Sequence, residues 1–176
     1  MHRTIAPATN VLMIQEDPLY EKAKAKALRL LSYRGRSKEE LRSKLGEKGF
    51  DETVIRKVID RFSELKYLDD EIFAQDWARH LALYRLWGDR KIAISLREKG
   101  IDGQTIDGAI LFAREEIGQK EAIKRLIEKR MKKRSFETID FKEKRRLAQN
   151  LLGRGFPPPL IFDVLGKVEE DYIDNG

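Results

Sequence analysis

The side chains best suited to catalysis are few in this chain and poorly spaced for it. Its only histidines are His2, near the N-terminus, and His80, in a segment with helical periodicity, and it contains no cysteine. A histidine base needs an oriented partner, and a zinc site needs several nitrogen or sulfur ligands at suitable spacing. Two isolated histidines offer neither arrangement, so we expect no catalytic residue and no metal ligand of these types.

Two pairs of adjacent carboxylates could in principle hold a metal ion or act as acid and base. Asp69 and Asp70 stand where a helix is expected to begin, so capping and the helix dipole explain them. Glu115 and Glu116 stand at the end of a helix, where solvation explains them. The glycines form neither a G-x-G-x-x-G nor a P-loop pattern, which argues against a nucleotide site. We expect a protein that is not an enzyme and needs no cofactor.

Basic residues, in contrast, are abundant and unevenly distributed. The chain of 176 residues has a net charge of +6. Residues 20–68 hold 14 Lys and Arg against 8 Asp and Glu, and residues 118–168 hold 14 against 6, whereas residues 69–117 hold 7 against 10. Two basic units therefore flank a slightly acidic centre, as expected of a surface that neutralises phosphates.

The candidate binding residues form two clusters and a central pair. The first cluster is Arg34, Arg36, Lys38, Arg42, Lys44 and Lys48; the central pair is Arg90 and Lys91; the second cluster is Lys129, Arg130, Lys132, Lys133, Arg134, Lys142, Lys144, Arg145 and Arg146. Such clusters suit a polyanion or an acidic protein partner. The alternative is a set of solvated helix faces crossed by ion pairs. Trp87, next to the central pair, could stack on a base, although packing at a helix junction is the favoured interpretation.

The elements that must position these residues form a repeat. The segments LRSKLGEKGF, IAISLREKGI and LAQNLLGRGF place Gly49, Gly100 and Gly155 at the same point, 51 and 55 residues apart. Apolar residues recur four and eight positions before each glycine and six, nine and ten after it, which are helical spacings. Because glycine accepts the left-handed conformation that ends a helix, each unit is predicted to contain a helix, a glycine stop and another helix.

Start signals complete three helices in the first unit. A helix is expected over residues 20–33, with Ala27, Leu28, Leu30 and Leu31 on its apolar side. Ser37 with Glu40 forms a capping box that opens the second helix. Asp51 caps a third helix that runs to about Leu65.

The second and third units follow the same plan. Asp69 is expected to cap a helix whose buried stripe is Phe73, Trp77 and Leu81, and Gly88 or Asp89 opens the helix that ends at Gly100. In the third unit a helix begins near Gln119, and Asp140 with Glu143 forms a second capping box. Pro157, Pro158 and Pro159 suit the start of the final helix, where a missing N–H has no cost.

These elements predict an all-α protein, an elongated curved array of three tandem three-helix repeats. The expected segments are an N-terminal arm (1–19), repeats at 20–68, 69–117 and 118–168, and an acidic C-terminal tail (169–176). Units of about 50 residues are expected to be stabilised by packing against the neighbouring units. The apolar run at residues 11–14 is too short for a signal peptide or a membrane span. Together with the absence of cysteine, this fits a cytoplasmic protein.

Three phrases in this chain resemble the RecX family of bacterial regulatory proteins. They are RGRSKEELRSKLGEKGF, ELKYLDDEIFAQDWAR and LWGDRKIAISLREKGI, in the family's order and spacing, and the resemblance covers roughly residues 20–168. It implies a curved array of three three-helix repeats without catalytic residues. It also implies a monomer that binds the RecA recombinase filament and single-stranded DNA, with double-stranded DNA as a further partner. Such a protein would lower RecA's ATPase and strand exchange in recombination, repair and the SOS response.

A non-catalytic helical DNA-binding module is the rival interpretation, because three-helix units also occur in helix-turn-helix proteins. No unit shows a second helix with Asn, Gln and Arg concentrated on one face for reading bases. Three unequal tandem repeats also do not suggest the two-fold half-sites of a repressor. Tight binding to one duplex sequence over random duplex would favour the rival.

Overall fold

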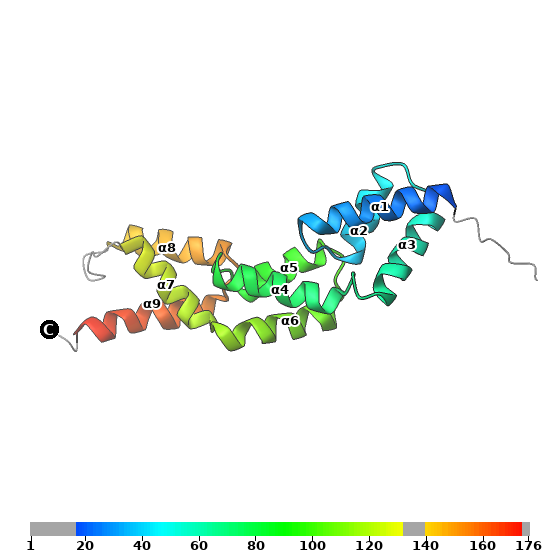
Figure 1. Cartoon of the computed structure of the whole chain (residues 1–176). Helices are drawn as coiled ribbons and strands as arrows, with labels where there is room; N and C mark the ends of the chain where they lie inside the picture. Colours follow the sequence, from blue (N-terminus) through cyan, green and yellow to red (C-terminus); the bar gives the residue numbers. More distant parts are fainter. Residues whose placement is uncertain (1–16, 132–139, 174–176) are drawn as a thin grey trace, which may run out of the picture.

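The computed structural model describes residues 17–131 and 140–173, and this part of the chain is all-helical, as predicted. Its helices are α1 (Pro18–Tyr33), α2 (Lys38–Gly46), α3 (Glu52–Glu64), α4 (Asp70–Leu83), α5 (Asp89–Arg97), α6 (Gly103–Glu116), α7 (Gln119–Met131), α8 (Phe141–Gly153) and α9 (Pro158–Ile173). They form three groups of three that follow one another along an elongated, curved molecule (Figure 1). We refer to α1–α3, α4–α6 and α7–α9 as the first, second and third repeats.

The predicted helix starts are confirmed at four capping residues. The side chain of Ser37 accepts a hydrogen bond from the Glu40 amide at 3.1 Å, and Asp51 caps α3 through the Thr53 amide. Asp69 accepts from two amides at the start of α4, and Asp140 accepts from the Glu143 amide at 2.7 Å. Each cap satisfies a donor that would otherwise lack a partner in the first turn. Gly88 is the N-cap of α5, which begins at Asp89.

The three glycine stops are confirmed as left-handed turns. Gly49, Gly100 and Gly155 have φ angles of +79°, +76° and +86°. In each turn the amide of the following residue donates to the carbonyl of the leucine five positions earlier, at 3.2–3.4 Å (Phe50 to Leu45, Ile101 to Leu96, Phe156 to Leu151). This is the bond that closes a Schellman motif, and it explains why both the glycine and the leucine recur.

The buried apolar residues form two clusters. One lies within the first repeat, and the other is shared by the second and third repeats. Two expectations about the core were wrong. Leu28 is 43% exposed, since Ala23 and Ala27 provide the buried face of α1. Trp77 is half-buried, while Phe73 and Leu81 are buried with Ala74 and Ala78. The small alanines allow the close packing of α4 against α6.

The repeats join through the glycine turns. The Ser37 hydroxyl, at the start of α2, donates to the carbonyl of Lys99 at 2.6 Å, and the Gly88 amide, at the start of α5, donates to the carbonyl of Arg154 at 2.8 Å. Lys99 and Arg154 each precede the glycine stop of the next repeat. A Cβ at Gly100 would overlap Glu39 of α2. The second helix of one repeat therefore starts against the glycine turn of the next, at both joints.

Candidate functional site

The first basic cluster is largely paired with carboxylates. Arg42 lies 3.3 Å from Glu52, and Lys44 lies 2.8 Å from Glu47. Arg36 is half-buried, and its Nε donates to the Leu30 carbonyl at 3.3 Å. The side chains of Lys38 and Lys48 are exposed, and their ammonium groups form no ion pair in the described part of the chain. Most cations of α2 are therefore neutralised by carboxylates, as the alternative interpretation of solvated, ion-paired helix faces predicted.

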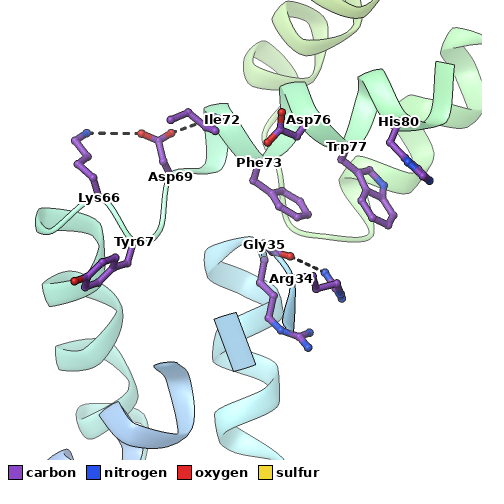
Figure 2. Close-up of a pocket in the computed structure, with 11 residues that line it drawn as sticks. Arg34, Gly35, Lys66, Tyr67, Asp69, Ile72, Phe73, Asp76, Trp77 and His80 are labelled. Atoms are coloured by element: carbon purple, nitrogen blue, oxygen red, sulfur yellow. Dashed lines mark hydrogen bonds and ion pairs between the residues drawn. The ribbon is translucent and has the colours of Figure 1, made fainter. Parts of the chain in front are cut away.

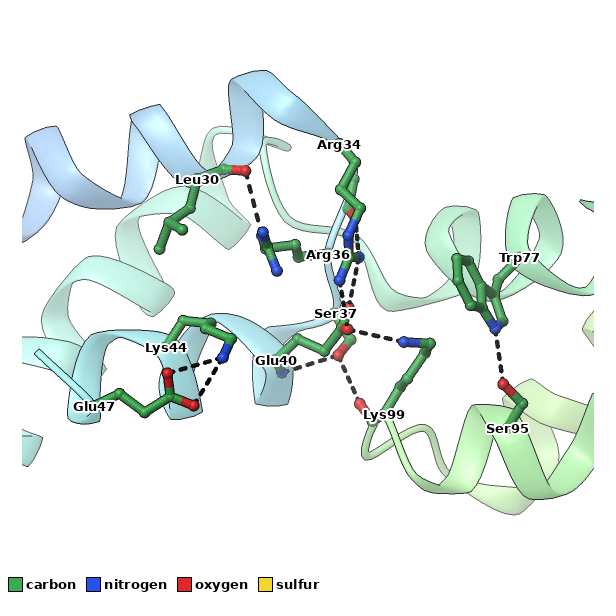
Figure 3. Close-up of polar contacts among 11 residues, drawn as sticks. Leu30, Arg34, Arg36, Ser37, Glu40, Lys44, Glu47, Trp77, Ser95 and Lys99 are labelled. Atoms are coloured by element: carbon green, nitrogen blue, oxygen red, sulfur yellow. Dashed lines mark hydrogen bonds and ion pairs between the residues drawn. The ribbon is translucent and has the colours of Figure 1, made fainter.

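Arg34 belongs to the joint between the first and second repeats, where it meets Glu40 and Lys99 (Figure 3). Its guanidinium donates to both carboxylate oxygens of Glu40, at 2.9 and 3.1 Å. The Lys99 ammonium, from the second repeat, donates to the same carboxylate at 2.8 Å. Glu40 and Lys99 are well shielded, with 17% and 14% of their side chains exposed. The predicted capping box is therefore confirmed only in part. The Ser37 side chain caps α2, whereas the Glu40 side chain joins the first two repeats.

The environment of Glu40 changes its proton affinity. Burial by itself would raise the pKa of this carboxyl group. Hydrogen bonds and positive charge from Arg34 and Lys99 outweigh burial and lower the pKa from 4.5 to about 2. Glu40 is thus ionised at neutral pH, and the joint depends on its charge.

Five cations of the second basic cluster are exposed and have no ion pair within the described residues. Lys129 and Arg130 lie at the end of α7, and Lys142, Arg145 and Arg146 lie on α8. All five are exposed, and none has an ion pair within residues 17–131 and 140–173. Lys144 is half-buried, and the predicted residues Lys132, Lys133 and Arg134 lie outside the described residues. The second cluster therefore has more exposed cations without an ion pair than the first cluster, in which these are Lys38 and Lys48.

The central pair separates in the structure. Arg90 is exposed, whereas Lys91 donates to the Gly153 carbonyl at 3.2 Å and lies 4.5 Å from the centre of the Trp87 ring. Trp87 is half-buried against the shared core, as the favoured interpretation expected. Lys91 and Trp87 thus help to join the second and third repeats.

An aromatic row along α4 was not identified from the sequence. Phe73, Trp77, His80 and Tyr84 succeed one another with ring centroids 6.0, 6.1 and 5.3 Å apart. The Trp77 indole N–H donates to Ser95 at 3.0 Å, which fixes the ring. The spacing of four, three and four residues could have indicated that these rings lie on one side of the helix. Phe73 and Trp77 were predicted only as part of a buried stripe.

The row lines two hollows. The smaller, of about 380 Å³, lies at the joint between the first and second repeats and includes Arg34, Lys66, Phe73, Trp77 and His80 (Figure 2). Figure 2 shows Phe73, Trp77 and His80 in succession along α4, with Arg34 across from them. The larger hollow, of about 610 Å³, reaches the third repeat. Because Trp77 and His80 line both, we refer to the two hollows together as the α4 groove.

Three of the four paired acids have structural partners. Asp69 caps α4, Asp70 accepts from the Lys38 amide at 2.9 Å, and Glu116 pairs with Arg79. Within the described ranges, no three His, Cys, Asp or Glu residues are grouped as a metal site would require. Among the described residues, no helix is long and apolar enough to cross a membrane.

Comparisons with known proteins agree along most of the chain. Family models described as the first, second and third three-helix domains of RecX match residues 23–62, 69–110 and 119–165. The regulatory protein RecX of Mycobacterium sp. (strain JLS) is 37% identical over 148 residues, which cover 82% of this chain and 80% of that protein. RecX of Halalkalibacterium halodurans is 36% identical over 143 residues, covering 81% of this chain and 53% of that protein. The crystal structure of RecX from Lactobacillus salivarius has the same fold, with a TM-score of 0.73, 24% identity, and coverage of 86% of this chain and 97% of that one.

Proposed function

Because this chain belongs to the RecX family of regulatory proteins, we propose that it binds RecA and RecA–DNA filaments and lowers their recombinase and ATPase activity in homologous recombination and the SOS response. The observation that carries the proposal is the succession of all three RecX domains, in order, between residues 23 and 165. The protein acts as a monomer in the cytoplasm, without catalysis, metal or cofactor.

Shape and charge support this proposal. A recombinase filament offers a helical groove walled by protein and containing the phosphates of DNA. An elongated, curved molecule of three repeats is suited to such a groove (Figure 1). The exposed cations of α7 and α8 are suited to its phosphates, since each neutralised phosphate releases counterions. The first repeat, whose α2 cations are mostly paired, contributes more through protein contacts.

Selective binding to the filament tests the proposal. We expect labelled protein to sediment with RecA filaments on single-stranded DNA, held by a non-hydrolysable ATP analogue, at salt concentrations that release it from naked DNA. The double variant Arg145→Glu/Arg146→Glu should bind filaments at least tenfold more weakly. The slope of log affinity against log salt should fall by about 0.7 for each lost phosphate contact.

The matched control for charge is Arg56→Glu/Lys57→Glu, which reverses two exposed cations of α3 outside the candidate clusters. It should bind filaments like the unmodified protein. If both double variants weakened binding equally, general charge would explain the interaction. If naked DNA bound as tightly as filaments across the salt range, the non-catalytic DNA-binding module would replace the regulator.

A further inference from the structure

Three cations and no carboxylate line the larger hollow of the α4 groove. They are Arg85, Lys129 and Arg154. Arg154 donates to the Arg85 carbonyl at 2.7 Å and to the Asn150 amide oxygen at 3.2 Å, so its partners carry no net charge. None of the three cations has an ion pair with another described residue. Their charges add in a concave surface, which attracts an anion more strongly than scattered cations do.

The same hollow presents aromatic ring faces. Tyr84 is 72% exposed, His80 is exposed, and Trp77 is half-buried. Trp77 is held by its hydrogen bond to Ser95 and by the Lys99 ammonium, 4.3 Å from the ring centroid. Rings held in place lose little freedom when a ligand stacks on them. A cationic groove that contains aromatic rings is the combination that binds single-stranded nucleic acid.

We propose that the α4 groove is a binding site for single-stranded nucleic acid, whose bases stack on the rings of Tyr84, His80 and Trp77. Phosphates contact Arg85, Lys129 and Arg154 in the larger hollow. The smaller hollow at the other end of the groove contributes less to phosphate binding, because Arg34 pairs with Glu40 and Lys66 pairs with Asp69. Asp69 and Asp76 also line this hollow (Figure 2). This inference rests on the proposed contact with DNA and identifies the surface that makes it.

Base stacking distinguishes single-stranded nucleic acid from duplex DNA and from an acidic peptide as the ligand of this groove. In a duplex, each base is covered above and below by its neighbours, so its face is closed to protein rings. An acidic peptide would satisfy the cations but brings few flat rings to the aromatic row. The groove therefore favours single strands over duplexes and over acidic peptides.

The protein's only tryptophans, Trp77 and Trp87, both line the larger hollow, so intrinsic fluorescence reports directly on this site. We expect oligothymidylate to quench the fluorescence in a saturable manner, in the absence of any recombinase. An abasic oligonucleotide of equal length carries the same phosphates without bases and should bind at least fivefold more weakly. Equal affinities for the two oligonucleotides would overturn the proposal, because phosphate contacts alone would then explain binding.

Tyr84→Ala should weaken oligothymidylate binding by roughly 5-fold to 100-fold, the range expected for loss of one stacked base. The matched control is Tyr33→Ala, since Tyr33 is 73% exposed and lies outside the groove. It should bind like the unmodified protein. Binding by Tyr84→Ala as tight as by the control would contradict the site, as would equal quenching by an acidic peptide.

These measurements use naked oligonucleotides, so their outcome is separate from that of the proposed function. If the groove does not bind single strands while the protein still sediments selectively with filaments, only the proposal that the α4 groove binds single-stranded nucleic acid is contradicted. If oligonucleotides bind the groove while the protein shows no preference for filaments over naked DNA, the groove proposal is supported and the proposed regulatory function is contradicted.

Discussion

Gly88→Ala is expected to reduce the free energy of unfolding by about 3 kcal/mol. A Cβ at this position would overlap the carbonyl group of Gly155 and lie 2.5 Å from the Phe156 nitrogen. Both neighbours are backbone atoms of the next repeat, so they cannot rotate away as a flexible side chain would. Gly88 has an ordinary φ of −77°, and therefore the cost comes from close approach and not from backbone strain.

Urea unfolding followed by circular dichroism measures this effect. Gly108→Ala is the matched control, because a Cβ there meets nothing within 4 Å and the residue lies inside α6. The control should be unchanged or more stable by up to about 1 kcal/mol, since alanine favours helix. Equal stability of the two variants would show that the second and third repeats do not pack through the Gly88–Gly155 contact.

Glu40→Gln is expected to cost about 2 to 3 kcal/mol of stability at pH 7, because it leaves Lys99 shielded without its carboxylate. The effect should depend on pH. The pKa of Glu40 is lowered on folding from 4.5 to about 2, so the charged carboxylate stabilises the folded protein above pH 4.5. That stabilisation is lost as the pH falls through about 2, where the variant and the unmodified protein should converge.

Urea unfolding of both proteins at pH 7, 4.5 and 2.5 tests this prediction. Glu47→Gln is the matched control, since Glu47 forms an exposed pair with Lys44 on the same helix. Exposed pairs contribute little to stability, so this variant should unfold like the unmodified protein. A difference between Glu40→Gln and the unmodified protein that stayed constant over the whole pH range would contradict the role of the Glu40 charge.

The repeat and its helices could be predicted because their signals are local. Helix caps such as Ser37 and Asp140 act within one turn, and Gly49, Gly100 and Gly155 end helices within their own segments. The second role of Gly100 and Gly155, close approach to the preceding repeat, could not be predicted. It depends on how the repeats pack, as the open space around Gly49, in the first repeat, makes clear.

The candidate site was harder to predict than the fold. Composition located the basic clusters, but pairing of cations such as Arg42 and Lys44 with glutamates depends on side-chain geometry. Helical periodicity assigned Trp77 to the core because periodicity shows only which residues are apolar. It does not show how the neighbouring helices pack, and their packing leaves Trp77 half-buried. The α4 groove combines Tyr84 of the second repeat with Lys129 and Arg154 of the third, which no local pattern connects. Whether the basic clusters bind DNA stays a prediction.

ATP hydrolysis by RecA tests the central claim most directly. RecA is assembled on saturating single-stranded DNA, and the protein is added far below the RecA concentration, with DNA sites in excess. We predict that hydrolysis falls at these low ratios, because each bound molecule acts on a filament of many RecA subunits. Hydrolysis that stays unchanged until the protein is abundant enough to coat the DNA would contradict the account and indicate simple competition for phosphates.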